Sequence, residues 1–174
     1  EVLARDGAWA EVIHRLHVSN TPSVAVVRGY AVAGGFTLAM GCDFVLAERG
    51  ARFGALEMAN GFPAAVATPI LANLIGPRLA LELAMFGQPV EAERLYEMGL
   101  INRLADDADD LAHVAAAFTG RLVELDPSSV ALTKQTHRAA ANMPLANSLD
   151  MGKQLNSLIA TSGVFDAAAA AFEA

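Results

Sequence analysis

The sequence predicts an α/β protein with a parallel β-sheet core, followed by a portion that is almost entirely helical. In the first half, short apolar runs alternate with segments of helical periodicity, the alternation from which parallel sheets are built. From Asp109 onward, long helical patterns follow one another with only proline-containing breaks between them. We therefore expect an α/β core in residues 1–104 and a helical C-terminal portion in residues 105–174.

Each expected element follows from a local pattern. Trp9 to His17 spaces its apolar residues along one face of a helix. Val24 to Val27 and Phe44 to Ala47 are apolar runs typical of buried strands. Between them, a turn of minimal side chains opens a helix from Gly34 to Gly41. The remaining expected elements are an extended piece at 51–54, helices at 65–74, 77–85, 91–98, 111–125, 128–141 and 144–159, a strand or extended edge at 100–104, and a turn or helix at 166–172.

The composition is apolar and acidic. With 174 residues, of which 54% are hydrophobic, the chain can build one substantial core. A mean hydropathy of +0.37 with only 18% charged residues favours an oligomer, or a fragment that lacks a partner segment. The formal net charge is −7 and the twelve basic residues are scattered, which disfavours nucleic acid as a partner.

Several kinds of site and location are excluded by what the sequence lacks. The single cysteine, Cys42, excludes an internal disulfide, and the four histidines show no metal-ligand spacing, so we expect no metal site. No stretch approaches the roughly 20 uninterrupted apolar residues of a membrane helix. The first twenty residues have neither the basic nor the apolar region of a signal peptide. We therefore expect a cytoplasmic protein with no membrane partner.

One strand-turn-helix segment points to chemistry. The strand beginning at Val24 leads into the small-residue turn Ala33-Gly34-Gly35, and the helix that follows begins with N–H groups that have no intrahelical partner. Such a helix start binds an anion or an oxygen that develops negative charge. Twenty positions after Thr37, Glu57 stands alone among apolar residues. An oxyanion site followed by a lone acid suits proton transfer next to a carbonyl, whereas phosphate-loop, dinucleotide-binding and nucleophile-elbow motifs are absent.

These residues resemble the signature of the crotonase (enoyl-CoA hydratase/isomerase) superfamily. The match begins with the apolar strand and continues through Gly29, Ala33-Gly34-Gly35, Met40 and Cys42-Asp43, and the similarity extends from about Trp9 to Phe172. The resemblance implies a crotonase-like (ClpP/crotonase) β-β-α spiral core with a helical C-terminal portion that mediates trimerisation. It also implies an acyl-CoA thioester as the substrate, no cofactor besides the coenzyme A of that substrate, and a homotrimer or hexamer.

The resemblance also assigns roles to individual residues. In the family, the middle residue of the small triplet, here Gly34, donates one N–H of the oxyanion hole. The carboxylate that matches Glu57 is a catalytic acid/base. The residues expected to bind substrate are Ala33, Gly35, Thr37, Met58, Phe62 and Pro63.

Two departures from the family pattern bear on the reaction. Thr37 stands where family hydratases carry a second catalytic glutamate; we expect it to fill space in the helix, with orientation of a water molecule or the acyl chain as the alternative. We also expect this chain to lack the family's N-terminal section, which supplies a second oxyanion N–H and much of the adenine site.

These departures shape the expected reaction. Moving a double bond needs one base that takes and returns a proton, whereas hydration usually recruits a second acid/base. The residues therefore favour an enoyl-CoA isomerase over an enoyl-CoA hydratase, with a non-catalytic crotonase-fold subunit as the alternative of another class.

Overall fold

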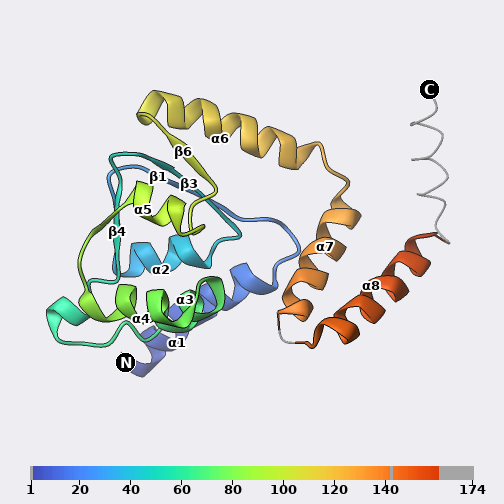
Figure 1. Cartoon of the computed structure of the whole chain (residues 1–174), viewed down its shortest axis with the longest axis horizontal. Helices are drawn as coiled ribbons and strands as arrows, with labels where there is room; N and C mark the ends of the chain where they lie inside the picture. Colours follow the sequence, from blue (N-terminus) through green and yellow to red (C-terminus); the bar gives the residue numbers. More distant parts are fainter. Residues whose placement is uncertain (1, 142, 161–174) are drawn as a thin grey trace. The chain divides into compact units, whose positions relative to one another are not determined.

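The structure, a computed structural model, divides into two compact units, residues 1–125 and residues 126–174 (Figure 1). It describes residues 2–141 and 143–160. The predicted boundary at 104/105 and the assignment of the helical portion to trimerisation stay predictions.

Two small sheets form the centre of the first unit. One sheet has the strand order β1-β3-β6 and the other has the order β2-β4-β5. All neighbouring strands run parallel except β4 and β5, which are antiparallel. The strands are β1 (Val24–Val27), β2 (Tyr30–Val32), β3 (Phe44–Glu48), β4 (Arg52–Gly54), β5 (Val90–Glu91) and β6 (Arg103–Ala105).

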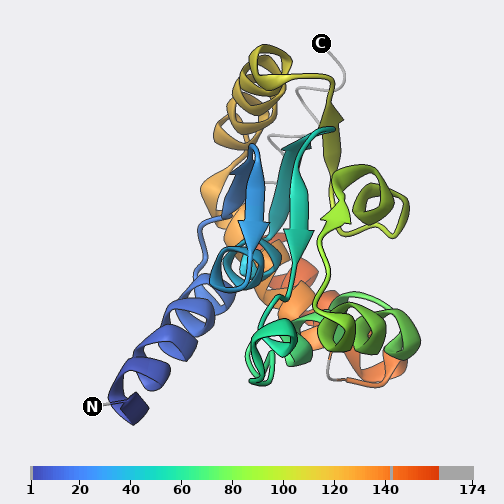
Figure 2. The ribbon, with the colours of Figure 1, turned by 90° about the vertical axis from the view of Figure 1, so that its left-hand side faces the viewer.

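The chain order of these elements repeats as strand, strand, helix. β1 and β2 lead into helix α2 (Gly34–Gly41), and β3 and β4 lead through a 3-10 turn, η1 (Met58–Asn60), into helix α3 (Ala67–Leu74). Because β1 pairs with β3 and β2 pairs with β4, the second repeat lies one strand further along both sheets. Figure 2 shows the blue and teal strands side by side with their arrowheads at the same end. This is the β-β-α spiral that the resemblance implies.

A carboxylate ties the starts of β1 and β3 together. Asp43 Oδ2 accepts hydrogen bonds from the Ser23 N–H at 2.7 Å and from Ser23 Oγ at 2.8 Å. The Asp43 N–H in turn donates to Ser23 Oγ at 3.0 Å. Asp43 is therefore a structural residue of the sheet.

The core of the first unit joins the helix that begins at Gly34 to the strand that leads towards Glu57. Phe36 of α2 and Phe53 of β4 are almost completely buried, and their rings meet edge to face with 6.5 Å between centroids. The other helices of this unit are α1 (Val2–Val18), α4 (Pro77–Phe86), α5 (Ala92–Glu97) and α6 (Ala108–Val123).

The second unit contains a helical pair, α7 (Pro127–Ala140) and α8 (Leu145–Ala160). Asp126 caps α7, because its Oδ1 accepts a hydrogen bond from the Ser129 N–H at 2.8 Å. This bond to the backbone lowers the pKa of Asp126.

The helix predictions are confirmed to within a few residues, apart from α1, which begins seven positions before Trp9. The turn or helix expected at 166–172 lies outside the described residues. Two short strands were not expected: Tyr30 begins β2, and the start of the expected helix at 91–98 is β5. The extended piece expected at 51–54 is confirmed and pairs as β4. Strands of two or three residues are too short to show a period, so their pairing depends on contacts distant in sequence.

Candidate active site

The candidate oxyanion turn is formed where β2 ends and α2 begins. The Ala33 N–H donates to the Gly54 carbonyl of the neighbouring strand segment at 2.8 Å. Ala33 has φ 49° and ψ −121°, a conformation that costs an L-residue roughly 1–3 kcal/mol. No side chain caps the helix, and the N–H groups of Gly34, Gly35 and Phe36 find no backbone acceptor in the described part of the chain. These amides can therefore bind a ligand oxygen.

Helix α1 packs across the start of α2. A Cβ at Gly34 would lie 3.7 Å from Trp9 Cζ2, and a Cβ at Gly41 would lie 3.1 Å from Ile13 Cδ1. The two glycines thus allow the larger side chains of α1 to approach the backbone of α2. Trp9 therefore lies next to the turn that carries the candidate oxyanion donor.

Glu57 follows the neighbouring strand at the same sheet edge. β2 and β4 are parallel and their last paired residues are Val32 and Gly54, so both segments leave the sheet at its carboxyl edge. The Glu57 carbonyl accepts hydrogen bonds from the Asn60 N–H at 2.9 Å and the Phe62 N–H at 3.2 Å. These two bonds fix the Glu57 backbone at the start of η1.

The Glu57 carboxylate is buried in part, and one of its oxygens has no hydrogen-bond partner among the described residues. The residue is half-buried, and Oε2 is the one side-chain oxygen or nitrogen of the described residues that is buried with no hydrogen-bond partner. A buried unpaired oxygen is unfavourable by about 1–3 kcal/mol, and such exceptions in a folded protein call for an explanation. A base that must accept a substrate proton provides one.

Two glycines hold the Glu57 segment against the chain that follows α4. Gly87 has φ +58°, and a Cβ there would lie 2.9 Å from the Ala59 nitrogen. A Cβ at Gly54 would lie 2.8 Å from the Gln88 carbonyl oxygen. Only glycine allows these approaches, so the position of Glu57 depends on both residues.

The structure places the other predicted site residues in different environments. Thr37 is buried, and its hydroxyl donates to the Ala33 carbonyl at 3.2 Å; its expected role, filling space or orienting a water molecule or the acyl chain, stays a prediction. Ala33 and Gly34 are half-buried. The exposed members of the set are Gly35, Met58, Phe62 and Pro63. Their contact with substrate stays a prediction.

The sequence matches the model of one protein family along almost its whole length. That model is named Enoyl-CoA hydratase/isomerase, and it covers residues 6–172. The chain belongs to the enoyl-CoA hydratase/isomerase family. Solved structures similar to this chain have the crotonase fold, which confirms the predicted fold class. The strand-turn-helix signature and the pairing of β1 with β3 and β2 with β4 are parts of this fold.

Relatives in the enoyl-CoA hydratase/isomerase family are longer than this chain. The short-chain-enoyl-CoA hydratase of Clostridium acetobutylicum is 32% identical over 126 residues, which are 72% of this chain and 48% of that protein. The 2,3-dehydroadipyl-CoA hydratase of Escherichia coli is 30% identical over 159 residues, 91% of this chain and 60% of that protein. The crystal structure of enoyl-CoA hydratase subunit I from Geobacillus kaustophilus matches with a TM-score of 0.86 at 32% identity, covering 94% of this chain and 63% of that one.

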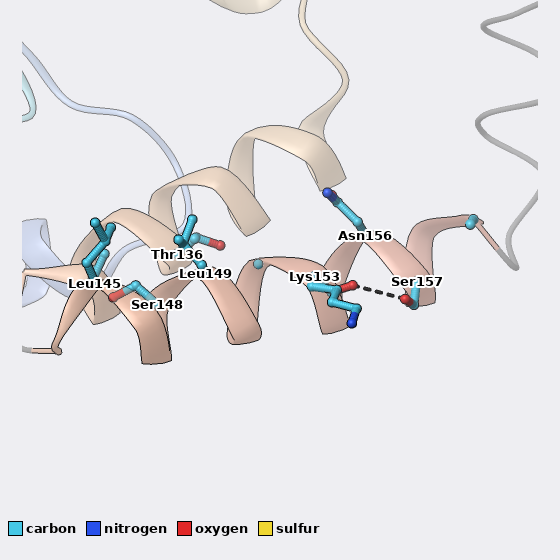
Figure 3. A pocket seen from close by; sticks show the side chains of 10 residues that line it. Thr136, Leu145, Ser148, Leu149, Lys153, Asn156 and Ser157 are labelled. Atoms are coloured by element: carbon cyan, nitrogen blue, oxygen red, sulfur yellow. Dashed lines mark hydrogen bonds between the residues drawn. The ribbon is translucent and has the colours of Figure 1, made fainter.

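The second unit contains a groove of its own. A groove of about 810 Å³ runs between α7 and α8, and Figure 3 shows the side chains that line it, among them Leu145, Leu149 and Lys153. It is lined by residues between Thr136 and Ala160, and Gly34 and Glu57 are not among them. The groove therefore does not include the candidate active site, which consists of the Ala33-Gly34-Gly35 turn, the Glu57 carboxylate and the contacts that support them.

Two classes of feature are not found in the described ranges. No group of three or more His, Cys, Asp or Glu side chains lies close enough to hold a metal ion in residues 2–141 and 143–160. No helix in the part that the structure describes has the length and apolarity to cross a bilayer.

Sequence reasoning did not identify the supports of the site. Gly87 directly follows α4, a position typical of a helix-ending glycine, and this signal predicts its positive φ. Its contact with Ala59 and the position of Trp9 over Gly34 join residues 25 or more positions apart, and no local pattern encodes them.

We expect Gly87→Ala to impair activity far more than Gly99→Ala. Both glycines have positive φ, so both substitutions carry the strain of an L-residue there, roughly 1–2 kcal/mol. Only at Gly87 would the new Cβ also collide with the nitrogen of Ala59, two residues after Glu57; at Gly99 no such atom lies within 4 Å. Urea unfolding and kcat should be measured for both variants. Equal activity in the two would contradict the role of Gly87 in placing Glu57.

Proposed function

We propose that the protein moves a proton at the carbon next to the carbonyl of an acyl-CoA thioester. Gly34 donates its N–H to the thioester oxygen, and Glu57 takes up and returns the proton. The observation that supports this most is the buried Glu57 Oε2, which has no hydrogen-bond partner in the part of the chain that the structure describes. It lies on a segment that leaves the same sheet edge as the start of α2, whose first N–H groups have no acceptor within that part either. The coenzyme A is part of the substrate, and no separate cofactor takes part.

The proposed chemistry depends on how charge changes during the reaction. When the proton leaves the carbon, negative charge gathers on the thioester oxygen, and a fixed amide dipole stabilises this enolate more than the neutral carbonyl. One such donor lowers the barrier by roughly 3–4 kcal/mol. The amide of Gly34 is held in place before the reaction starts, so it need not reorient as charge develops.

Isomerisation of an enoyl-CoA fits a single carboxylate best. A base removes a proton from the second carbon of a 3-enoyl chain, the double bond moves, and the same base delivers the proton to the fourth carbon. Glu57 can do both steps. The position of a second acid is occupied by Thr37, whose hydroxyl hydrogen is engaged by the Ala33 carbonyl and which cannot ionise near neutral pH.

Hydration of a 2-enoyl-CoA is the second candidate, favoured by the names of the relatives. The matched proteins of Clostridium acetobutylicum and Escherichia coli are both named as hydratases. In this case Glu57 would have to activate the water by itself. A cytoplasmic homotrimer or hexamer is proposed for either reaction, and sedimentation of the purified protein tests the oligomeric state.

We expect the purified protein to convert a 3-enoyl-CoA into the conjugated 2-enoyl-CoA faster than it hydrates a 2-enoyl-CoA. The absorbance of the conjugated thioester rises in the first reaction and falls in the second, so one spectrophotometric assay at matched concentrations compares them. Intact mass should be measured first, because it defines the polypeptide under test. Faster hydration would reverse the proposal in favour of a hydratase, and neither reaction would indicate a non-catalytic subunit.

A further inference from the structure

The peptide group between Ala33 and Gly34 connects the buried core to the candidate oxyanion site. Its carbonyl belongs to Ala33 and its N–H to Gly34, and the group is planar with the two ends pointing in opposite directions. The Ala33 carbonyl accepts two hydrogen bonds from Thr37, one from the backbone N–H at 3.0 Å and one from Oγ1 at 3.2 Å. Because both bonds draw the carbonyl along the helix, the Gly34 N–H points out of the helix start.

The neighbouring groups fix this peptide further. The Ala33 N–H is held by the Gly54 carbonyl at 2.8 Å, so Ala33 is bonded at its amide as well as its carbonyl. A strained conformation such as that of Ala33 persists only where surrounding contacts determine it. Thr37 is 1% exposed, so its side chain cannot rotate freely into water.

We propose that Thr37 is a positioning residue of the active site. Its hydroxyl, by donating to the Ala33 carbonyl, aims and polarises the peptide whose other end is the Gly34 N–H. A carbonyl that accepts a hydrogen bond draws electron density from its amide, and the N–H then becomes a stronger donor; one bond changes the next by about 10–30%. This inference rests on the proposed function, because it assumes that the Gly34 N–H binds the thioester oxygen.

The same kind of bond occurs in helices away from the site. Thr119 Oγ1 of α6 donates to the Ala115 carbonyl at 2.7 Å, also four residues back. In α6 the N–H of the residue after Ala115 already donates a hydrogen bond within the helix, so the bond from Thr119 cannot strengthen a contact with a ligand. Thr119 is therefore a matched control for the structural part of the effect.

We expect Thr37→Val to lower kcat about two- to eightfold with little change in KM. Loss of a whole oxyanion donor lowers kcat by about 10²–10³-fold. If the hydroxyl contributes about 10–30% of the corresponding free energy, kcat falls about two- to eightfold. Valine keeps the shape of threonine and lacks the hydroxyl. Thr37→Ser restores the hydroxyl and should recover most of kcat, whereas Thr119→Val should leave kcat unchanged.

Two spectroscopic measurements separate positioning from general packing. In the ligand-free protein, the ¹⁵N resonance of Gly34 should shift in Thr37→Val and return in Thr37→Ser, because it responds to a hydrogen bond on the preceding carbonyl. With bound butyryl-CoA, a saturated thioester, difference infrared spectra should show a smaller lowering of the carbonyl stretch in Thr37→Val than in wild type. If the valine variant does not fold, Thr37→Ala replaces it.

The outcomes for Thr37 differ from those for the proposed function. If Glu57→Gln retains full activity, the proposed function fails whatever Thr37 does. If that function holds but Thr37→Val matches wild type in kcat and carbonyl stretch, the inference is wrong. It is also overturned if serine gives no recovery, or if Thr119→Val shows the same loss.

Discussion

Replacing Glu57 with glutamine should lower kcat by about 10²–10⁴-fold, the contribution typical of a general acid/base. Glutamine has the shape of glutamate but cannot accept the substrate proton. Because Glu57 Oε2 has no hydrogen-bond partner among the described residues, the exchange breaks no bond that this oxygen makes there. Burying a neutral amide is also less unfavourable than burying a charged carboxylate. The free energy of unfolding should therefore stay the same or rise while activity is lost.

The measurement for Glu57→Gln combines enoyl-CoA turnover with urea unfolding. Glu97→Gln is the matched control, because Glu97 is an exposed carboxylate at the end of α5. It should retain wild-type kcat. A Glu57→Gln variant with the activity of wild type would remove the enzymatic interpretation and leave the family assignment. A large loss of stability would instead indicate that Glu57 has a structural role.

The fold could be predicted from the sequence where patterns are long or distinctive. The strand at β1, the small-residue turn and the helices of the C-terminal portion have a clear period or a clear boundary residue. The short strands β2, β4 and β5 do not. Their pairing places Val32 beside Gly54 and Phe53 beside Val90, contacts between residues 22 and 37 positions apart. Such pairing is decided by the packing of the whole core and not by local preference.

The sequence points to a candidate donor and a candidate base, whose roles stay predictions, but it does not reveal the contacts that support them. Gly34 and Glu57 stand in recognisable surroundings, because one follows a strand in a small-residue turn and the other is an isolated acid. The bond from Thr37 to the Ala33 carbonyl spans four residues of a predicted helix, so its spacing was available in the sequence. The positive φ of Ala33 was not, since alanine rarely adopts it.

A second large effect is expected from removing the Gly34 N–H. Gly34→Pro should lower kcat by about 10²–10³-fold, since proline has no amide hydrogen to donate to the thioester oxygen. Gly34 is the first residue of α2, where proline is well tolerated because that N–H has no partner in the helix. Ala33, with φ 49° and ψ −121°, lies outside the extended region that the residue before a proline prefers, so the substitution adds strain at Ala33 but removes no hydrogen bond of the helix. The helix should still form, with a lower free energy of unfolding.

Gly34→Ala separates the loss of the N–H from the added side-chain atom. A Cβ at this position would meet Trp9 Cζ2 at 3.7 Å, an ordinary contact, and alanine keeps its amide hydrogen. We expect the alanine variant to retain most of kcat and the proline variant to lose it, with circular dichroism and unfolding curves verifying that both fold. If the proline variant stays active, the Gly35 or Phe36 amide must bind the thioester oxygen instead. If both variants lose activity equally, space at Gly34 and not its N–H is what the reaction requires.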